Sequence, residues 1–137
     1  MLSREFRSVD FQRREDYVLG RLREEHDPVL GFGRLPEPAR TDVFQVAYFY
    51  QTLGFLVAFD LADQDLVLAT LNYRIKRIWP VLEPYVRRER EIRGQGFLNI
   101  LEDLVVRAHE NPSPDLQKRL RLRTMPPTPP PELPSDA

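Results

Sequence analysis

Apolar residues recur every three or four positions along most of this chain, the spacing that places side chains on one face of an α-helix. The longest series is Leu68, Leu71, Ile75, Ile78, Leu82 and Val86. It predicts helix from about residue 64 to 91, which we divide near Asn72 into helices over 64–71 and 73–91. No segment alternates apolar and polar residues as a half-buried β-strand does. The pattern therefore indicates an all-α fold.

Polar residues mark where these helices begin. Ser8 is suited to cap the first long helix, Thr41 or Asp42 the second and Asp63 the third, because their side-chain oxygens accept hydrogen bonds from free backbone N–H groups. We expect a short turn around residues 3–6 before the first helix. The second helix is apolar on nearly every face, which is typical of the most buried helix of a bundle. We expect a compact bundle of about five helices, over residues 8–26, 41–59, 64–71, 73–91 and 95–109.

Two prolines, Pro80 and Pro84, lie inside the fourth predicted helix. Proline lacks the N–H that bonds to the carbonyl four residues before it, so it weakens a helix interior. A spacing of four puts both gaps on one side, and we expect the helix to bend there and continue. Trp79 is expected to pack on the second helix near Gly54. Glycine costs a helix about 1 kcal/mol relative to alanine, which a close helix crossing would explain.

The composition changes near residue 111. Residues 1–110 carry the helical pattern and are expected to form a single domain, whereas residues 111–137 contain eight of the 13 prolines. This second part begins with the basic stretch KRLRLR (118–123) and ends in MPPTPPPELPSDA. A segment so rich in proline cannot bury a core, so we expect a flexible tail whose end is extended polyproline II or disordered. Residues 115–123 are expected to form a short helical turn or to stay mobile.

Composition excludes several classes of protein. The chain has 137 residues and no cysteine, which removes disulfides and thiolate nucleophiles. Its net charge of −1 gives no overall attraction to nucleic acid, so nucleic acid is not expected as a partner. The most apolar run, residues 43–59, is shorter than the roughly 20 residues that span a bilayer and contains three polar residues. We expect no transmembrane segment and a cytoplasmic location.

No catalytic, cofactor or metal motif is present, and we expect no enzymatic activity. His26 and His109 each end a predicted helix and have no second ligand at metal-binding spacing. The aspartates of residues 60–65 lack the glycine and glutamate of a calcium loop, so they indicate a helix cap. If the chain were an enzyme, Glu83 near Arg87 would be the first residue to suspect.

Some side chains are candidates for binding another molecule. The second helix carries more aromatic residues than one buried face can hold, and Tyr48, Phe55 and Phe59 are expected to contribute to a partner surface. Two basic groups are further candidates, namely Arg87, Arg88 and Arg90, and Arg119, Arg121 and Arg123. The first group alternates with glutamates, so we interpret it chiefly as the solvated end of a helix.

Three segments together resemble the uncharacterised bacterial DUF4760 family. They are YFYQTLGFLV (48–57), DLADQDLVL (60–68), and the spacing of Trp79, Pro84 and Arg88 with four and then three residues between them. The resemblance covers about residues 5–108 and excludes the tail. It implies an all-helical fold and brings no assigned activity and no catalytic residues.

Two functions are consistent with this pattern. The favoured one is a protein-interaction or self-association module without catalytic activity, with a homodimer or another protein as its partner. The alternative is an accessory module that contacts nucleic acid or a membrane surface through the basic segment 118–123. No cofactor is expected with either function, and the sequence leaves any small-molecule ligand open.

Overall fold

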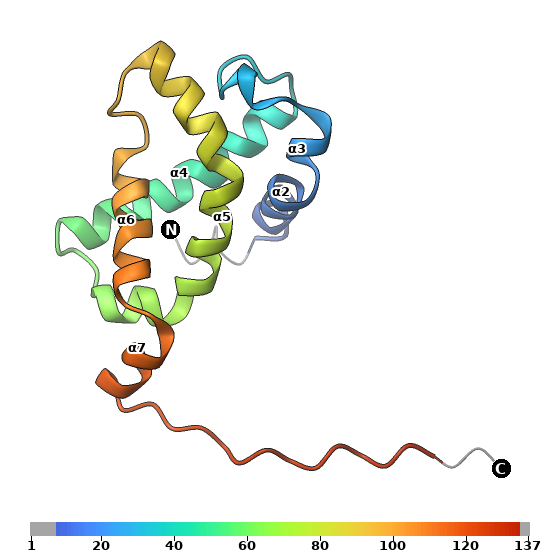
Figure 1. Cartoon of the computed structure of the whole chain (residues 1–137), viewed down its shortest axis with the longest axis vertical. Helices are drawn as coiled ribbons and strands as arrows, with labels where there is room; N and C mark the ends of the chain where they lie inside the picture. The colour runs from blue at the N-terminus through green and yellow to red at the C-terminus, as the bar shows by residue number, and fades with distance from the viewer. Residues whose placement is uncertain (1–7, 135–137) are drawn as a thin grey trace.

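Residues 8–134 are described by the computed structural model, in which every regular element is helical (Figure 1). The elements are α2 (Val9–Gly20), α3 (Leu22–Glu25), the 3-10 turn η1 (Pro28–Leu30), α4 (Ala39–Ala58), α5 (Gln64–Arg93), α6 (Asn99–Glu110) and α7 (Ser113–Arg119). No strand occurs among residues 8–134, so the all-α prediction is confirmed. The turn predicted around residues 3–6 lies outside the described residues.

The first predicted helix, over residues 8–26, is divided in two. Its start is as predicted, since the Ser8 hydroxyl accepts a hydrogen bond from a first-turn backbone N–H at 3.0 Å. However, α2 ends at Gly20, and α3 begins at Leu22 after Arg21 has left the helical conformation with φ of −129°. Glycine is a weak helix former, so one helix through this point has little intrinsic support. After the break Leu22 is fully buried.

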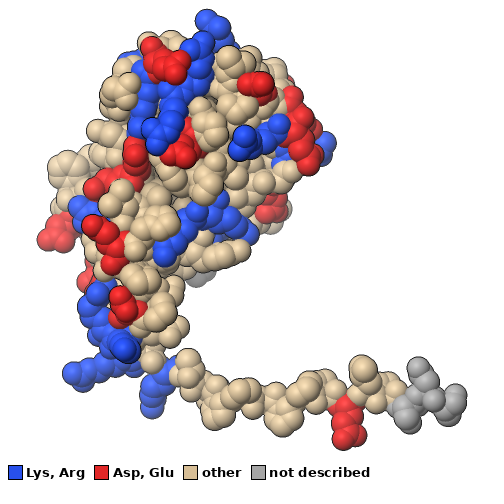
Figure 2. Space-filling model, viewed as in Figure 1, with Lys and Arg blue, Asp and Glu red and all other residues tan. Residues whose placement is uncertain are grey.

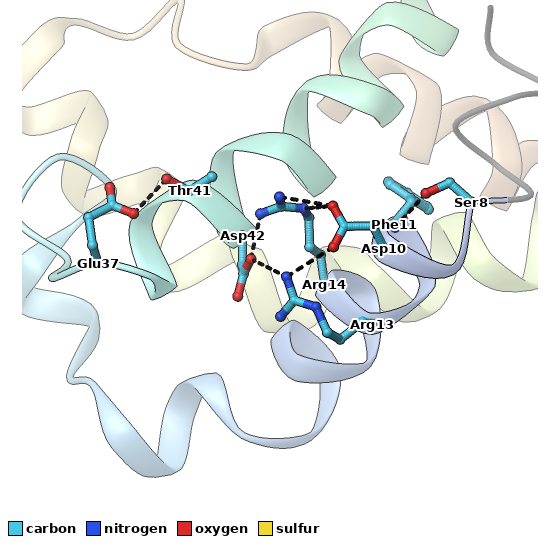
Figure 3. Close-up of polar contacts among 8 residues, drawn as sticks. All are labelled: Ser8, Asp10, Phe11, Arg13, Arg14, Glu37, Thr41 and Asp42. Atoms are coloured by element: carbon cyan, nitrogen blue, oxygen red, sulfur yellow. Dashed lines mark hydrogen bonds and ion pairs between the residues drawn. The ribbon is translucent and has the colours of Figure 1, made fainter.

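The start of α4 differs from the prediction. The helix begins at Ala39, and Pro38 occupies its cap position. The Thr41 hydroxyl donates to the Glu37 carboxylate at 2.5 Å. Asp42 is buried and accepts a hydrogen bond from Arg14 of α2 at 2.6 Å, which ties the two helices together (Figure 3). Thr41 and Asp42 are therefore not caps, because the helix has already begun at Ala39 and both residues lie inside its first turn.

A close crossing occurs at Gly54, where α6 approaches α4, while the packing of Trp79 near Gly54 stays a prediction. α4 packs against both α2 and α6, which makes it the central helix, as predicted. A Cβ atom on Gly54 would lie 2.8 Å from the carbonyl oxygen of Ile100 and 3.2 Å from Cβ of Leu104, both in α6. Trp79 is half-buried at the edge of the core. The glycine thus lets the backbones of α4 and α6 approach.

The break predicted near Asn72 is wrong, because α5 is a single helix of 30 residues. The side-chain amide of Asn72 donates to the carbonyl oxygens of Ala108 and Asn111, each at 3.0 Å. A polar residue can therefore be buried here without leaving the helix. The helix also continues through Pro80 and Pro84, and Figure 1 draws it as one ribbon from green to yellow.

Both ends of α5 follow from local sequence. The Asp63 carboxylate accepts a hydrogen bond from the N–H of Leu66 at 3.0 Å, so the predicted cap is confirmed. Gly94 ends the helix with φ of +112°, a conformation that other residues rarely adopt.

The next helix, α6, begins at Asn99 instead of residue 95, because Leu98 has a left-handed backbone conformation with φ of +56°. Along α5 the predicted apolar stripe is buried at Leu68, Leu71, Ile75, Ile78, Leu82 and Val86.

The chain beyond residue 110 begins with a helix that packs on the bundle. Leu116 of α7 is buried, and α7 lies against α5. Residues 122–134 form neither helix nor strand, are exposed throughout, and extend away from the bundle in Figure 1. Disorder of this tail stays a prediction. Within residues 8–134, no helix combines the length and apolar character needed to cross a membrane.

Candidate interaction surfaces

The C-terminal half of α4 leaves one aromatic stripe in solvent. We call Tyr48, Thr52, Phe55 and Phe59 the aromatic face, since their spacing of three or four residues places them on one side of the helix. Tyr48 and Phe55 are each 44% exposed and Phe59 is 60% exposed. The rings of Phe55 and Phe59 lie 4.4 Å apart. The stripe carries no charge, although it faces water.

The other aromatic residues of α4 are used inside the protein. Phe49 and Tyr50 are buried, and the Phe49 ring lies 4.6 Å from that of Phe11 in α2. Phe44 is half-buried and stacks on Tyr48 at 5.6 Å, with the guanidinium of Arg93 5.7 Å from its ring. The structure therefore divides the aromatic residues into a packed set and the aromatic face, as the sequence predicted.

The arginines at the end of α5 differ in their surroundings. Arg87 is exposed and pairs with Glu83 at 2.6 Å, as its helical spacing predicted. Arg88 donates to the carbonyl of Val29 at 2.9 Å. Arg90 is only 8% exposed and donates to the carbonyl of Phe97 at 2.8 Å. The interpretation of a solvated helix end is therefore wrong for Arg90, which joins α5 to the turn before α6.

Three carboxylates are buried among the described residues, and the contacts of two of them, Glu15 and Glu89, were not predicted from the sequence. Glu15 of α2, which is 1% exposed, bonds to the Tyr50 hydroxyl of α4 and to the Arg74 guanidinium of α5. Burial and the neighbouring negative charge of Glu15 raise the pKa of Tyr50, so it keeps its proton and acts as a donor. A signal existed in the sequence, because Glu15 falls on the apolar spacing between Phe11 and Val18.

Glu89 is the second buried carboxylate. One of its oxygens accepts hydrogen bonds from the N–H groups of Phe32 at 2.8 Å and Gly33 at 3.0 Å, and the other pairs with Arg93 at 2.6 Å. Burial alone raises the pKa of Glu89, but the N–H groups of Gly33 and Phe32 and the charge of Arg93 outweigh it, so the pKa is lowered. A Cβ on Gly31 would lie 2.6 Å from this carboxylate. The loop is thus folded around Glu89.

Figure 3 shows a third carboxylate cluster, at the junction of α2 and α4. The Arg14 side chain lies between Asp10 and Asp42, with a 3.0 Å bond to the first and a 2.6 Å bond to the second. Arg13 lies 3.5 Å from Asp42. Each buried charge is matched by a cation, as a buried charge requires. We interpret these clusters as structural.

The basic segment 118–123 is only partly tied to the bundle. Arg119 donates to both oxygens of Asp65 in α5, at 2.7 and 2.9 Å, and to Asn111 at 2.9 Å. Arg121 and Arg123 are exposed. Blue Lys and Arg side chains gather around α7 and the start of the tail in Figure 2, whereas both charges are mixed over the bundle.

Residues considered for catalysis do not form a shared site in the structure. Glu83 bonds to Arg87, whereas His26 ends α3 and accepts a hydrogen bond from Tyr85 at its backbone carbonyl. His109 is exposed in the last turn of α6. Among residues 8–134, no three His, Asp or Glu residues converge as metal ligands would.

No protein-family model matches this chain, and no curated protein or solved structure matches it either. The resemblance to the DUF4760 family therefore stays a prediction.

Proposed function

We propose that this chain is a protein-interaction module that binds a second copy of itself through the aromatic face. One observation carries the proposal, namely the uncharged stripe of Tyr48, Phe55 and Phe59 that stays in solvent on the central helix of the bundle. Exposed apolar patches of this kind are typical of interaction sites. A second copy is the simplest occupant, because an apolar stripe without charge is complementary to itself across a two-fold axis.

The size of the aromatic face predicts a weak dimer. An aromatic side chain has roughly 150–250 Å² to bury, so the exposed fractions of the three rings amount to roughly 300 Å². A standard interface uses about 800 Å² from each partner. At about 25 cal/mol per Å², two copies would gain about 15 kcal/mol, of which association consumes about 4–15 kcal/mol. The remaining gain is about 0–11 kcal/mol, and its midpoint of about 5.5 kcal/mol corresponds to a dissociation constant of about 100 µM, which is the value we expect.

Sedimentation equilibrium over about 1–500 µM measures this association directly. The double variant Phe55→Ser/Phe59→Ser should be monomeric over the whole range, because it removes the exposed rings without touching the core. Tyr73→Ser is the matched control, since Tyr73 is 70% exposed on α5 and lies outside the aromatic face. Raising the salt concentration should not weaken the dimer, because apolar contacts do not depend on ion pairing. A wild-type chain that is monomeric at the highest concentration refutes the proposal.

A crosslink tests the geometry independently of affinity. The chain contains no cysteine, so a single introduced thiol reports on one position only. Thr52 lies at the centre of the aromatic face, and a two-fold axis there brings both copies of residue 52 together. Thr52→Cys should form a disulfide dimer under mild oxidation, whereas Thr70→Cys, exposed on α5, should not. Equal crosslinking of both variants would place the contact elsewhere.

A further inference from the structure

Charge is distributed unevenly along the chain. Residues 116–131 contain four basic residues and no acidic one. Residues 1–115 carry 16 basic and 19 acidic residues, so an acidic body of net charge −3 is joined to a basic segment of +4. The segment projects from the body where α7 ends (Figure 2). At physiological salt, charges more than about 8 Å apart are screened from each other, so the segment can attract an anion despite the acidic body.

Three cations of this segment are free to bind. We call residues 118–125 the basic arm. Arg119 is held by Asp65, but Lys118, Arg121 and Arg123 have no acidic partner within residues 8–134. All three side chains are exposed. The basic arm therefore offers three uncompensated positive charges within six residues.

Apolar side chains alternate with these charges. Leu120 is 38%, Leu122 55% and Met125 88% exposed. An anionic nucleic acid would use the cations but leave these aliphatic chains in water, because single strands are bound by aromatic stacking and duplexes by polar contacts. A bilayer surface uses both, since basic groups meet the lipid phosphates while apolar chains enter the interface.

Arg121 has a left-handed backbone conformation, which is uncommon for arginine. The N–H of Arg121 donates to the carbonyl of Lys118 at 3.1 Å, and the N–H of Leu122 donates to the carbonyl of Gln117 at 2.9 Å. These two bonds form a Schellman motif, whose left-handed position is usually glycine or asparagine. Arg121 occupies that position with φ of +55°. The chain thus keeps a cation where helix termination alone favours a smaller residue.

We propose that the basic arm is a docking site for an anionic lipid bilayer surface. Lys118, Arg121 and Arg123 supply the attraction to lipid headgroups, and Leu120 and Met125 enter the interface. The binding is peripheral and reversible, because a few charges and short apolar chains do not anchor a protein permanently. The basic arm shares no residue with the aromatic face, so lipid binding can be tested independently of self-association.

Co-sedimentation of the full chain with lipid vesicles tests this proposal. Vesicles of phosphatidylcholine with roughly 30 mol % phosphatidylserine should bind the chain, and pure phosphatidylcholine should not. The variant Lys118→Ser/Arg121→Asn/Arg123→Ser should bind the anionic vesicles about 100-fold more weakly, because each cation contributes about fivefold. Asparagine suits the left-handed position, so the α7 terminus is preserved. Unchanged circular dichroism verifies the fold.

Two further variants test whether vesicle binding depends on the basic arm itself or only on the total charge of the chain, and whether it uses the apolar side chains. Arg23→Ser/Arg34→Ser/Arg77→Ser removes three exposed cations from the body and should change vesicle binding by less than about twofold. Leu120→Ser/Met125→Ser should weaken vesicle binding about tenfold, because it removes the inserted apolar chains.

Three results would overturn the proposal. The first is equal binding to both kinds of vesicle. The second is a loss of binding in the body variant as large as in the basic-arm variant. The third is an oligonucleotide bound more tightly than the anionic vesicles, together with vesicle binding that does not depend on the apolar side chains. That last outcome would assign the basic arm to nucleic acid.

Discussion

Glu89 offers the sharpest test of the structure, because one side chain satisfies a loop 56 residues away in sequence. In the variant Glu89→Ala, the N–H groups of Phe32 and Gly33 lose their acceptor. Arg93 loses its ion-pair partner at the same time. The variant Glu89→Gln keeps an amide oxygen in place of the carboxylate oxygen, so both N–H groups can stay bonded while the charge is lost.

The magnitude follows from burial. A buried N–H without a partner costs about 1–3 kcal/mol, and this applies fully to Phe32. Gly33 is half-buried, so water can replace part of its bond. Arg93 is 46% exposed, and a pair at such a site contributes less than about 1 kcal/mol. We expect Glu89→Ala to lower the free energy of unfolding by about 2–5 kcal/mol, and Glu89→Gln by about 1 kcal/mol.

Urea denaturation followed by circular dichroism measures both values, at a protein concentration low enough to keep the chain monomeric. Glu83→Gln is the matched control, since Glu83 lies on the same helix and pairs with exposed Arg87. It should change the free energy of unfolding by less than about 0.5 kcal/mol. If Glu89→Ala is as stable as this control, the loop around Phe32 is not held by Glu89.

The pH dependence tests the same contact through its charge. The pKa of Glu89 is lowered from its ordinary value of 4.5 in the folded state, because the N–H groups and Arg93 outweigh the effect of burial. A lowered folded pKa means that the stabilisation is present above pH 4.5 and is lost as the pH falls through the folded value. The difference in stability between wild type and Glu89→Gln should therefore shrink below pH 4.5. A difference that grows on acidification would contradict this assignment.

Two further predictions concern packing. Gly54→Ala should destabilise the protein by about 1–3 kcal/mol, because the new Cβ would lie 2.8 Å from the Ile100 carbonyl and push α6 outward. The control is Gly20→Ala, because a Cβ atom on Gly20 would have no neighbour within 4 Å, so this variant should be as stable as wild type or more stable by up to about 1 kcal/mol. A Gly54→Ala variant that is more stable than wild type would refute the close crossing. Asn72→Ala should cost about 1–3 kcal/mol, because it leaves the Ala108 carbonyl without a side-chain partner. Urea denaturation measures the free energy of unfolding of both variants. If amide hydrogen exchange at the end of α6 is the same in Asn72→Ala as in wild type, the contact between Asn72 and Ala108 does not stabilise that end.

The sequence predicted features that depend on residues close together in the chain. Ser8 and Asp63 cap helices because each accepts a bond from a residue three positions later. The apolar stripe from Leu68 to Val86 follows from helical periodicity alone. The split of the first helix was missed, although Gly20 marks its place. All of these features depend on residues within about four positions of each other in the sequence.

The candidate surfaces were predicted less completely. The aromatic residues of α4 were expected to divide between core and solvent, and Tyr48, Phe55 and Phe59 are indeed exposed. The predicted solvated position is wrong for Arg90, which is buried against the turn before α6. Periodicity held a signal, because Arg90 follows Val86 by four residues and continues the buried stripe, whereas Arg87 lies off it. The partner of Arg90 at Phe97 lies beyond the helix and is not given by that spacing.

What the sequence by itself determined is where most helices form, because caps, periodicity and glycine act within about four residues. Only the tertiary structure decided which charges are buried. Glu15 meets Tyr50 and Arg74, at separations of 35 and 59 residues, and Glu89 meets Phe32 at a separation of 57. A buried carboxylate is stable only where donors from other elements converge on it. That convergence depends on how the helices pack, which no local pattern specifies.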